Sequence, residues 1–570
     1  MHLTFKTISL VAASFLWVGC GSGSGGYEDS SNSGSSNNEN ATVKNVTIID
    51  DIQVESLGLG NDVRAKINIG DTPKDLYILL SNYSKTRSES PAITHNQKRV
   101  SESKAKTVSS SDMSFQALHA PRVVQESNAI VKKLLKKNRT TSDRQVKIVE
   151  TVTQRSRTIV GNAKNFYLDA EGKSTTIATA RKVVSNVNTS LGRKTLSVWV
   201  SDDSFGSGCS KAKCVTQNMV DVLANTFLRN GADNDIYDWV TNIYGEEWES
   251  DAQAKHSELI DKSDEITILL TDIDKDNSAT GGAIGFFWSK DNVKKASISG
   301  SNERIMFYAD AVMFANVEGT WSIDDLWPKE LVSTLVHEFQ HMIHFYQKTV
   351  LLADEATDTW IDEMLAETTE DIIATKIRYH GPRAVRYTDG SAGSGHNTEG
   401  RYPMFNANNR LSLTSWSNTL ANYSKVSAFG TYLVRNYGGA KLLHDIMHNS
   451  YVDQQAIVSA VHKSINGSDK TFNDLQREWG VAVLLSANEN LEDLPSYNTG
   501  DFTFSSYKNS TYKMGSINFF NYSPLPKVST SAGTVLKQGN YYYKIGKGLR
   551  GNITVDLNLD ANTEATLIVQ

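Results

Sequence analysis

The apolar and polar positions of this chain fall into three successive patterns. Short β-forming runs bounded by Gly, Asn and Ser predict strands at residues 63–69 and 75–80. Helical spacing dominates from Pro328 to about residue 480. Aromatic strands return near the end of the sequence, at residues 540–545 and 552–558. This order predicts an α+β fold in which a central domain lies between two β-rich modules.

The chain before Pro328 contains both amphipathic helices and further strands. Apolar spacing predicts one helix at residues 215–228 and another, rich in lysine, at residues 125–140. For the lysine-rich helix, a solvated face is favoured over contact with a lipid surface. Further strands are predicted at residues 195–200, 265–271 and 304–309.

Composition places the chain among soluble globular proteins of several domains. It has 570 residues, of which 39% are hydrophobic and 21% are charged. The net charge of -6 gives no reason to expect a nucleic-acid partner. We expect an N-terminal β-rich domain with a helical segment at residues 44–194, a central domain at residues 195–490 and a C-terminal β module at residues 491–570.

The N-terminus has the pattern of a targeting segment. Lys6 precedes an apolar run at residues 8–18, which suits a signal peptide and is too short to span a bilayer. Gly19 and Cys20 then resemble the end of a bacterial lipoprotein signal, and residues 21–43 are rich in Gly, Ser and Asn. The sequence predicts export, lipidation of Cys20, a flexible tether and a periplasmic or cell-surface location. An ordinary cleaved signal peptide is the alternative.

Two further cysteines, Cys209 and Cys214, lie five residues apart in a loop-like stretch. In an exported protein this spacing predicts a local disulfide, with unpaired thiols as the alternative. Half of a metal site is disfavoured because no second cysteine pair or nearby histidine cluster completes it.

The helix predicted from Pro328 carries an H-E-x-x-H motif at residues 337–341. His337 and His341 are one turn apart, close enough for both imidazoles to bind one zinc ion. Glu338 is rotated by about 100° from His337 and is placed to act as a general base. The core-facing positions of this helix recur every fourth residue, at Leu331, Leu335, Phe339 and Ile343.

The residues after the motif restrict the class of zinc site. A metzincin needs Gly and His where this chain has His344 and Gln347, so that class is excluded. His344 lies about 10.5 Å along the helix axis from His337, so a packing or supporting role is favoured for it. On the next predicted helix, three glutamates share one face, for which solvation is the ordinary explanation: Glu363, Glu367 and Glu370.

These motifs resemble the thermolysin-type (gluzincin) zinc site and, more narrowly, the hyicolysin-like bacterial metallopeptidases. The resemblance rests on residues 337–341, 360–363 and 366–367, and is extended by 271–274, 281–287, 306–310 and 423–438. It implies a zincin-type domain with a small sheet and a helical subdomain. Glu363 would be the third zinc ligand, and Glu367 would hold a ligand histidine. Asp362 stands where Asn commonly precedes the ligand.

The resemblance also implies an activity, namely hydrolysis of protein or peptide substrates. One catalytic zinc ion would act with Glu338, while Tyr423 would stabilise the oxyanion, with Tyr432, His380 and His396 as alternatives. The strand at residues 304–309 would present its edge to an extended substrate.

Two other hypotheses remain from the residues alone. Asp272, Asp274 and Asp276 have the spacing at which a calcium loop begins, but Asn277 and Ala283 stand where such a loop requires Gly and Glu. A polar turn is therefore favoured over a calcium site. The alternative function is a surface adhesin or structural lipoprotein with a non-catalytic H-E-x-x-H motif.

Overall fold

A computed structural model describes residues 41–97, 122–139, 157–352, 357–379, 400–489, 491, 493–497, 500–504 and 510–570. The expected signal peptide, Cys20 and the tether up to residue 40 lie outside the described residues. Within the described ranges, no helix combines the length and apolar character that crossing a membrane requires.

Strands occur near both ends of the chain, and helices fill most of the region between residues 311 and 485. The strands are β1 (Thr42–Thr47), β2 (Gln53–Leu59), β3 (Val63–Asn68), β4 (Lys74–Asn82), β5 (Ala92–His95), β6 (Ala163–Tyr167), β7 (Thr175–Thr189), β8 (Gly192–Ser201), β9 (Glu265–Thr271), β10 (Gly285–Phe287), β11 (Ile305–Asp310), β12 (Gly500–Phe504), β13 (Ser510–Met514), β14 (Gly539–Leu549), β15 (Asn552–Asn558) and β16 (Thr563–Val569). The helices are α1 (Arg122–Arg139), α2 (Gln217–Phe227), α3 (Ile236–Tyr244), α4 (Asp251–Lys255), α5 (Ala311–Phe314), α6 (Leu326–His344), the π-helix η5 (Phe345–Leu352), α7 (Thr359–Ile377), α8 (Arg401–Asn408), α9 (Leu420–Asn436), α10 (Ala440–Met447), α11 (Gln454–Val461) and α12 (Phe472–Leu485).

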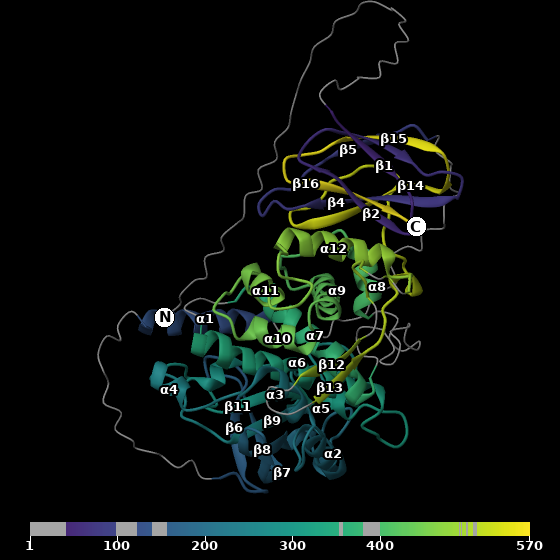
Figure 1. Ribbon diagram of the computed structural model, residues 1–570. Helices are drawn as coiled ribbons and strands as arrows, with labels where there is room; N and C mark the ends of the chain where they lie inside the picture. The colour runs from purple at the N-terminus through teal and green to yellow at the C-terminus, as the bar shows by residue number, and fades with distance from the viewer. Residues whose placement is uncertain are drawn as a thin grey trace, which may run out of the picture. The chain divides into compact units, whose positions relative to one another are not determined.

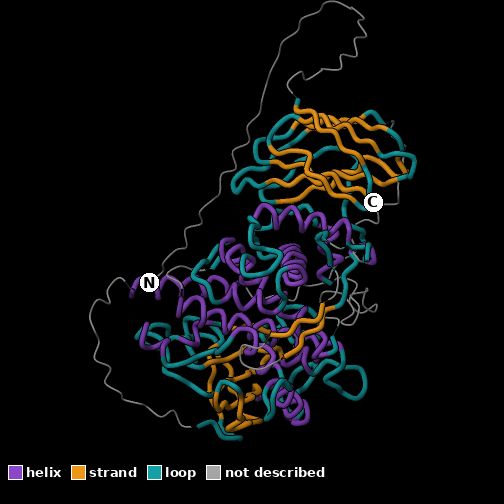
Figure 2. The backbone as a smooth tube through the Cα atoms, viewed as in Figure 1, coloured by secondary structure: helices purple, strands orange, loops and turns teal. Residues whose placement is uncertain are grey.

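Strands from the two ends of the chain interleave in two four-stranded sheets, ordered β1-β3-β15-β5 and β14-β4-β16-β2 among the described residues. Figure 1 shows purple N-terminal strands alternating with yellow C-terminal strands, and Figure 2 shows that strands and loops make up this part. Strands from the two expected β modules thus form one sandwich, although β6 and β7 belong to another sheet and β12 pairs with β13. Local patterns identify strands but not their partners, because the pairing residues are nearly 500 positions apart, as for Arg64 and Asp556.

Both faces of β4 are buried, which accounts for its continuous apolar run. Leu76, Ile78 and Leu80 point into the sandwich core, while Leu79 belongs to the larger core of the helical region. A Cβ at Gly480 of α12 would lie 2.7 Å from Leu79 Cδ2, so the backbone of α12 lies directly on β4. Residues Ala41–Gln570 accordingly form one compact unit.

A further, six-stranded sheet has the order β10-β11-β9-β8-β7-β6 in the described chain. Strands β8, β9 and β11 run parallel, while β6, β7 and β10 pair in antiparallel fashion with their neighbours. The expected boundary at residues 194–195 therefore falls inside a strand of this sheet. The mixed α+β class, with β-rich ends around a helical region, is confirmed.

Helix α6 begins two residues before Pro328, which lies in the first turn where a missing N–H breaks no helical hydrogen bond. Its apolar stripe is buried, including Leu331, Leu335 and Phe339. Side chains of α6 also reach the six-stranded sheet: the Phe339 ring packs edge-on against Phe307 of β11, and Glu338 Oε2 accepts a hydrogen bond from the Phe287 N–H at 2.8 Å. Sheet and helix together therefore fix the position of the H-E-x-x-H motif.

Candidate metal centre

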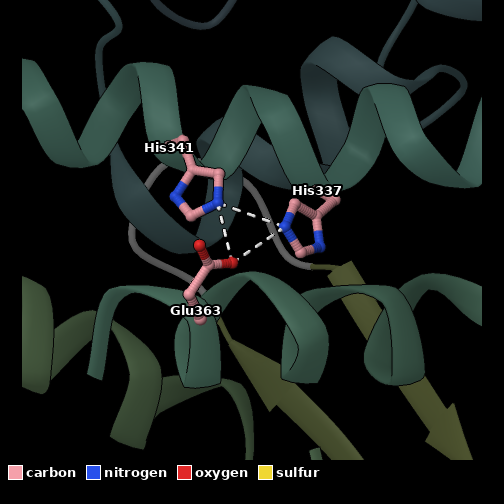
Figure 3. A group of neighbouring side chains, drawn as sticks. All are labelled: His337, His341 and Glu363. Carbon is pink, nitrogen blue, oxygen red and sulfur yellow. Dashed lines mark hydrogen bonds and ion pairs between the residues drawn. The ribbon is translucent and has the colours of Figure 1, made fainter. Parts of the chain in front are cut away.

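Three potential metal ligands converge between α6 and α7. His337 and His341 project from α6 toward Glu363 on α7 (Figure 3). The distances are 3.1 Å between the two Nε2 atoms, 3.4 Å from His337 Nε2 to Glu363 Oε2 and 3.3 Å from His341 Nε2 to the same oxygen. All three residues are largely buried.

This arrangement fits a zinc ion. Ligand atoms about 2.0–2.1 Å from a tetrahedral zinc ion lie roughly 3.3 Å from one another, which matches the observed separations. Glu363 Oε2 is buried and receives no hydrogen bond from the described residues. The other ring nitrogen of each histidine contacts a carboxylate, so each Nε2 presents a lone pair to the same point as Glu363 Oε2. A cation between them would compensate these three converging acceptors.

The carboxylates that orient the two imidazoles differ from the expected one. Glu370 Oε1 lies 2.8 Å from His337 Nδ1, and Asp362 Oδ1 lies 2.9 Å from His341 Nδ1. Glu367, which was expected to hold a histidine, instead accepts hydrogen bonds from Arg401 Nε at 3.0 Å. Because Arg401 is buried, its charge needs the Glu367 carboxylate as partner. The sequence pattern placed Glu370 on the same face of α7 as Glu363 and Glu367. Nothing in the local sequence indicated that Glu370, rather than Glu367, contacts a ligand histidine.

The charges around the ligands shift their protonation equilibria. Burial lowers the pKa of His337, but its contacts with Glu363 and Glu370 outweigh this effect and raise the pKa to about 10. Burial raises the pKa of Glu363, but the adjacent imidazoles reverse this and lower it to about 2. Both shifts have the same electrostatic origin, because carboxylates and imidazoles stabilise each other's charged forms. The centre therefore favours an ionised Glu363, and a metal ion bound there would take the place of the proton on His337.

Glu338 lies next to the ligand His337 in sequence and is not among the possible metal ligands found in the described residues. Burial raises the pKa of Glu338, against the effect of the two imidazoles. Its partner Phe287 belongs to β10, the edge strand of the sheet on this side. The expectation that residues 304–309 provide a free edge is wrong, because β11 pairs with β10 on one side and β9 on the other. An extended substrate would meet β10 instead.

Tyr423 is the expected oxyanion donor that the structure brings to this centre. Its hydroxyl lies 3.4 Å from Glu363 Oε1 and 3.1 Å from Asn418 Oδ1. The Tyr432 hydroxyl is hydrogen-bonded to Tyr437 and Glu478 in another part of the core. The remaining alternatives, His380 and His396, lie outside the described residues.

His344 and the aspartates of the turn at residues 272–276 all contact other residues of the protein. His344 Nδ1 lies 3.3 Å from Asp362 Oδ1, and burial lowers the pKa of His344 to about 4. Asp272 pairs with Lys211 at 2.9 Å, Asp274 accepts the Ala283 N–H, and Asp276 accepts the Ser278 N–H. None of these aspartates belongs to a group of potential metal ligands in the described ranges.

The cysteine pair stabilises the loop that faces this turn. Cys209 and Cys214 form a disulfide. Within the loop that they close, the Ala212 N–H donates to Asn277 Oδ1 at 2.7 Å, and Lys211 binds Asp272. The disulfide loop thus contacts the turn that leads to β10.

Comparison with known proteins identifies the family to which this chain belongs. The family model described as Peptidase M30 matches residues 173–554, which include the whole of α6 and α7. The chain is also 26% identical over 247 residues to the neutral metalloprotease ShpI of Staphylococcus hyicus, an alignment covering 41% of this chain and 51% of that protein. The chain thus spans about half the length of this curated relative. The resemblance to hyicolysin-like metallopeptidases is confirmed, and this protein belongs to the Peptidase M30 family of metallopeptidases.

Proposed function

We propose that this protein is a zinc-dependent endopeptidase that hydrolyses extracellular or host proteins. The convergence of His337, His341 and Glu363 on one point carries the proposal. A zinc ion held there would supply Lewis acidity and lower the pKa of a water molecule at its open coordination position. Family membership supports the peptidase activity.

Glu338 is the proposed general base. Its carboxylate takes a proton from the attacking water and returns it to the leaving amine. The Phe287 N–H holds Oε2 in place, which leaves Oε1 for the proton transfer. Burial raises the pKa of Glu338, and a more basic carboxylate is a better proton acceptor.

Tyr423 is the proposed donor to the developing oxyanion. Its hydroxyl is close to Glu363, so it lies at the rim of the metal centre. Trp416 packs edge-on against the Tyr423 ring at 5.0 Å between centroids and restricts its orientation. A Tyr423→Phe variant should lose kcat with little change in zinc content, because phenylalanine retains the ring packing.

The test compares residues 41–570 with and without Glu338→Gln. The expected result is one zinc ion per chain in both proteins, with casein hydrolysis slower by about 10²- to 10⁴-fold in the variant. Glutamine retains the acceptor for Phe287 but cannot accept the proton. A folded chain without zinc or hydrolysis would contradict the proposal and favour the adhesin hypothesis.

A second comparison tests the ligand set. Glu363→Ala should lose zinc, whereas Glu367→Ala should keep more of it because Glu367 pairs with Arg401 rather than a histidine. Full zinc content in Glu363→Ala together with zinc loss in Glu367→Ala would refute Glu363 as the third ligand.

Export with a lipid anchor at Cys20 is part of the proposal. The pattern of residues 1–43 supports it, and the Cys209–Cys214 disulfide is typical of an oxidising compartment. Cys20→Ser should abolish incorporation of a labelled fatty acid while leaving the hydrolytic activity of the purified chain unchanged. Equal labelling of both chains would exclude this residue as the anchor.

A further inference from the structure

A cavity of about 300 Å³ lies among the start of α7, the start of α11, the loop before α9 and two segments flanking sandwich strands. This volume is at the lower end of the range for ligand pockets. Its lining residues include Trp360 and Trp416 and the charged residues Asp358, Asp453 and Lys85. The proposed mechanism uses no charged group of this cavity.

The cavity adjoins the metal centre through two elements. Trp360 precedes the ligand Glu363 by three residues on α7, about 4.5 Å along the helix axis. Trp416 packs against Tyr423, whose hydroxyl lies 3.4 Å from Glu363 Oε1. This proximity is the geometric basis for assigning the cavity to a substrate side chain near the bond that is cut.

Hydrogen bonds hold the walls of the cavity in place. The buried Gln538 accepts a hydrogen bond from Thr414 Oγ1 at 2.5 Å and donates one to Gln454 Oε1 at 3.0 Å. The Asp358 N–H donates to Val452 O at 2.8 Å, which joins the start of α7 to the residue before Asp453. The cavity is thus preformed rather than assembled by a ligand.

Its charges favour a cation. Burial raises the pKa of Asp358 and the nearby Asp453 raises it further, while the hydrogen bond from the Trp360 N–H and the charges of Lys85 and Lys132 act in the opposite direction. Two carboxylates that repel each other are stabilised by an added positive charge. The two aromatic residues in the lining, the largely buried Trp360 and the partly buried Trp416, provide aromatic surface of the kind that packs against an aliphatic stem and attracts a cation.

We infer that this cavity receives a lysine or arginine side chain of the substrate, next to the bond that is cut. The inference rests on the proposed peptidase function and specifies its substrates. The aliphatic stem lies along Trp360 and Trp416, and the charged head reaches Asp358 and Asp453. Lys85, at the rim, limits the preference because it competes for the same carboxylates.

The test measures kcat/KM of the full zinc-loaded chain on paired peptides. A single lysine is moved through the three positions on either side of the scissile bond, and each peptide is compared with one carrying norleucine, which lacks the amine. We expect about a tenfold preference for lysine at one position, corresponding to about 1.4 kcal/mol. Because Asp358 and Asp453 remain partly accessible to solvent, the preference should decrease at high salt.

Three variants separate charge from structure. Asp453→Asn should reduce the lysine-to-norleucine ratio by about fivefold, since asparagine still caps α11 but carries no charge. Lys85→Met should raise the ratio, an effect that a merely structural role does not produce. Asp469→Asn, at an exposed aspartate outside the cavity, should leave it unchanged.

Equal hydrolysis of lysine and norleucine peptides at every position would overturn the inference while the peptidase function stands. Stronger hydrolysis of the norleucine peptides would assign the cavity to an apolar side chain and overturn it as well. Hydrolysis of no peptide by the zinc-loaded chain would refute the proposed function itself.

Discussion

The contact between Glu370 and His337 is the residue-scale feature with the clearest consequence for metal binding. Glu370 also accepts a hydrogen bond from Ser333 Oγ at 2.7 Å, so its carboxylate is fixed on both sides. Removing a carboxylate that orients a ligand histidine costs about 10- to 100-fold in metal affinity. Glu370→Ala should therefore weaken zinc binding by this factor, measured by competition with a chromophoric chelator.

Glu370→Gln is the matched control for that measurement. Glutamine keeps an acceptor for the His337 N–H but removes the negative charge. If Glu370→Gln recovers most of the zinc affinity that Glu370→Ala loses, the loss is due to the orientation of the His337 ring. Wild-type affinity in Glu370→Ala would show that His337 needs no such partner.

A different residue, Asp310, should make stability depend on pH. Burial raises the pKa of Asp310 to about 7, although its carboxylate accepts the backbone N–H groups of Met313 and Ile273. The folded chain thus binds this proton more tightly than the unfolded chain, whose aspartate titrates at about pH 4. Between these two values unfolding releases the proton, so stability falls as the pH rises, by up to about 1.4 kcal/mol per unit, and levels off above pH 7.

Asp310→Asn isolates this contribution. The free energy of unfolding of the wild type minus that of the variant should decrease from pH 4 to pH 7. Asparagine provides one acceptor instead of two, which adds an offset that does not change with pH. A difference that is constant across the range would contradict a raised pKa.

At the residue scale, the sequence was sufficient to identify candidate residues that lie within one turn of each other on the same helix. His337, Glu338 and His341 share one helix, so geometry within that helix was enough to place them. The partners Glu370 and Asp362 were not identified, because which carboxylate meets which ring depends on the packing of α7 against α6. Arg401 was missed for the same reason, since only the fold brings it to Glu367.

At the scale of elements, the close packing of α9 on α7 positions Tyr423. A Cβ at Gly430 would lie 2.0 Å from Thr368 Oγ1 and 2.9 Å from Met364 Cγ. Gly430→Ala should therefore push α9 away from α7 and destabilise the fold by about 1–3 kcal/mol. Because Tyr423 lies on the same helix, kcat should fall as well, as measured by thermal unfolding and peptide hydrolysis.

Thr368→Ala provides the compensating change for this helix pair. It removes the hydroxyl that the new methyl group meets first, so the double variant should be more stable than Gly430→Ala alone. Two independent, additive losses would show that the helices do not meet at this point.

At the scale of the whole molecule, strands were predicted but their assembly was not. The predicted runs at residues 265–271 and 552–558 coincide with β9 and β15. Nothing in a local pattern indicated that β15 inserts between β3 and β5, because a sheet joins segments far apart in the chain. The continuous apolar run of β4 was a signal that both faces are buried, and its second face contacts the helical region.

That second face should determine how residues 41–570 unfold. Leu79 is fully buried against α12, so Leu79→Ala should remove about 2–5 kcal/mol from the contact between the sandwich and the helical region. We expect one calorimetric transition for residues 41–570 and two in Leu79→Ala, because the sandwich then unfolds first. Ile78→Ala, which faces only the sandwich core, should lower the sandwich stability without exposing α12. Two transitions already present in the wild type would mean that the interface does not couple the unfolding of the sandwich to that of the helical region. The cavity bordered by Lys85 and Gln538 would then lose part of its wall whenever the sandwich unfolds on its own.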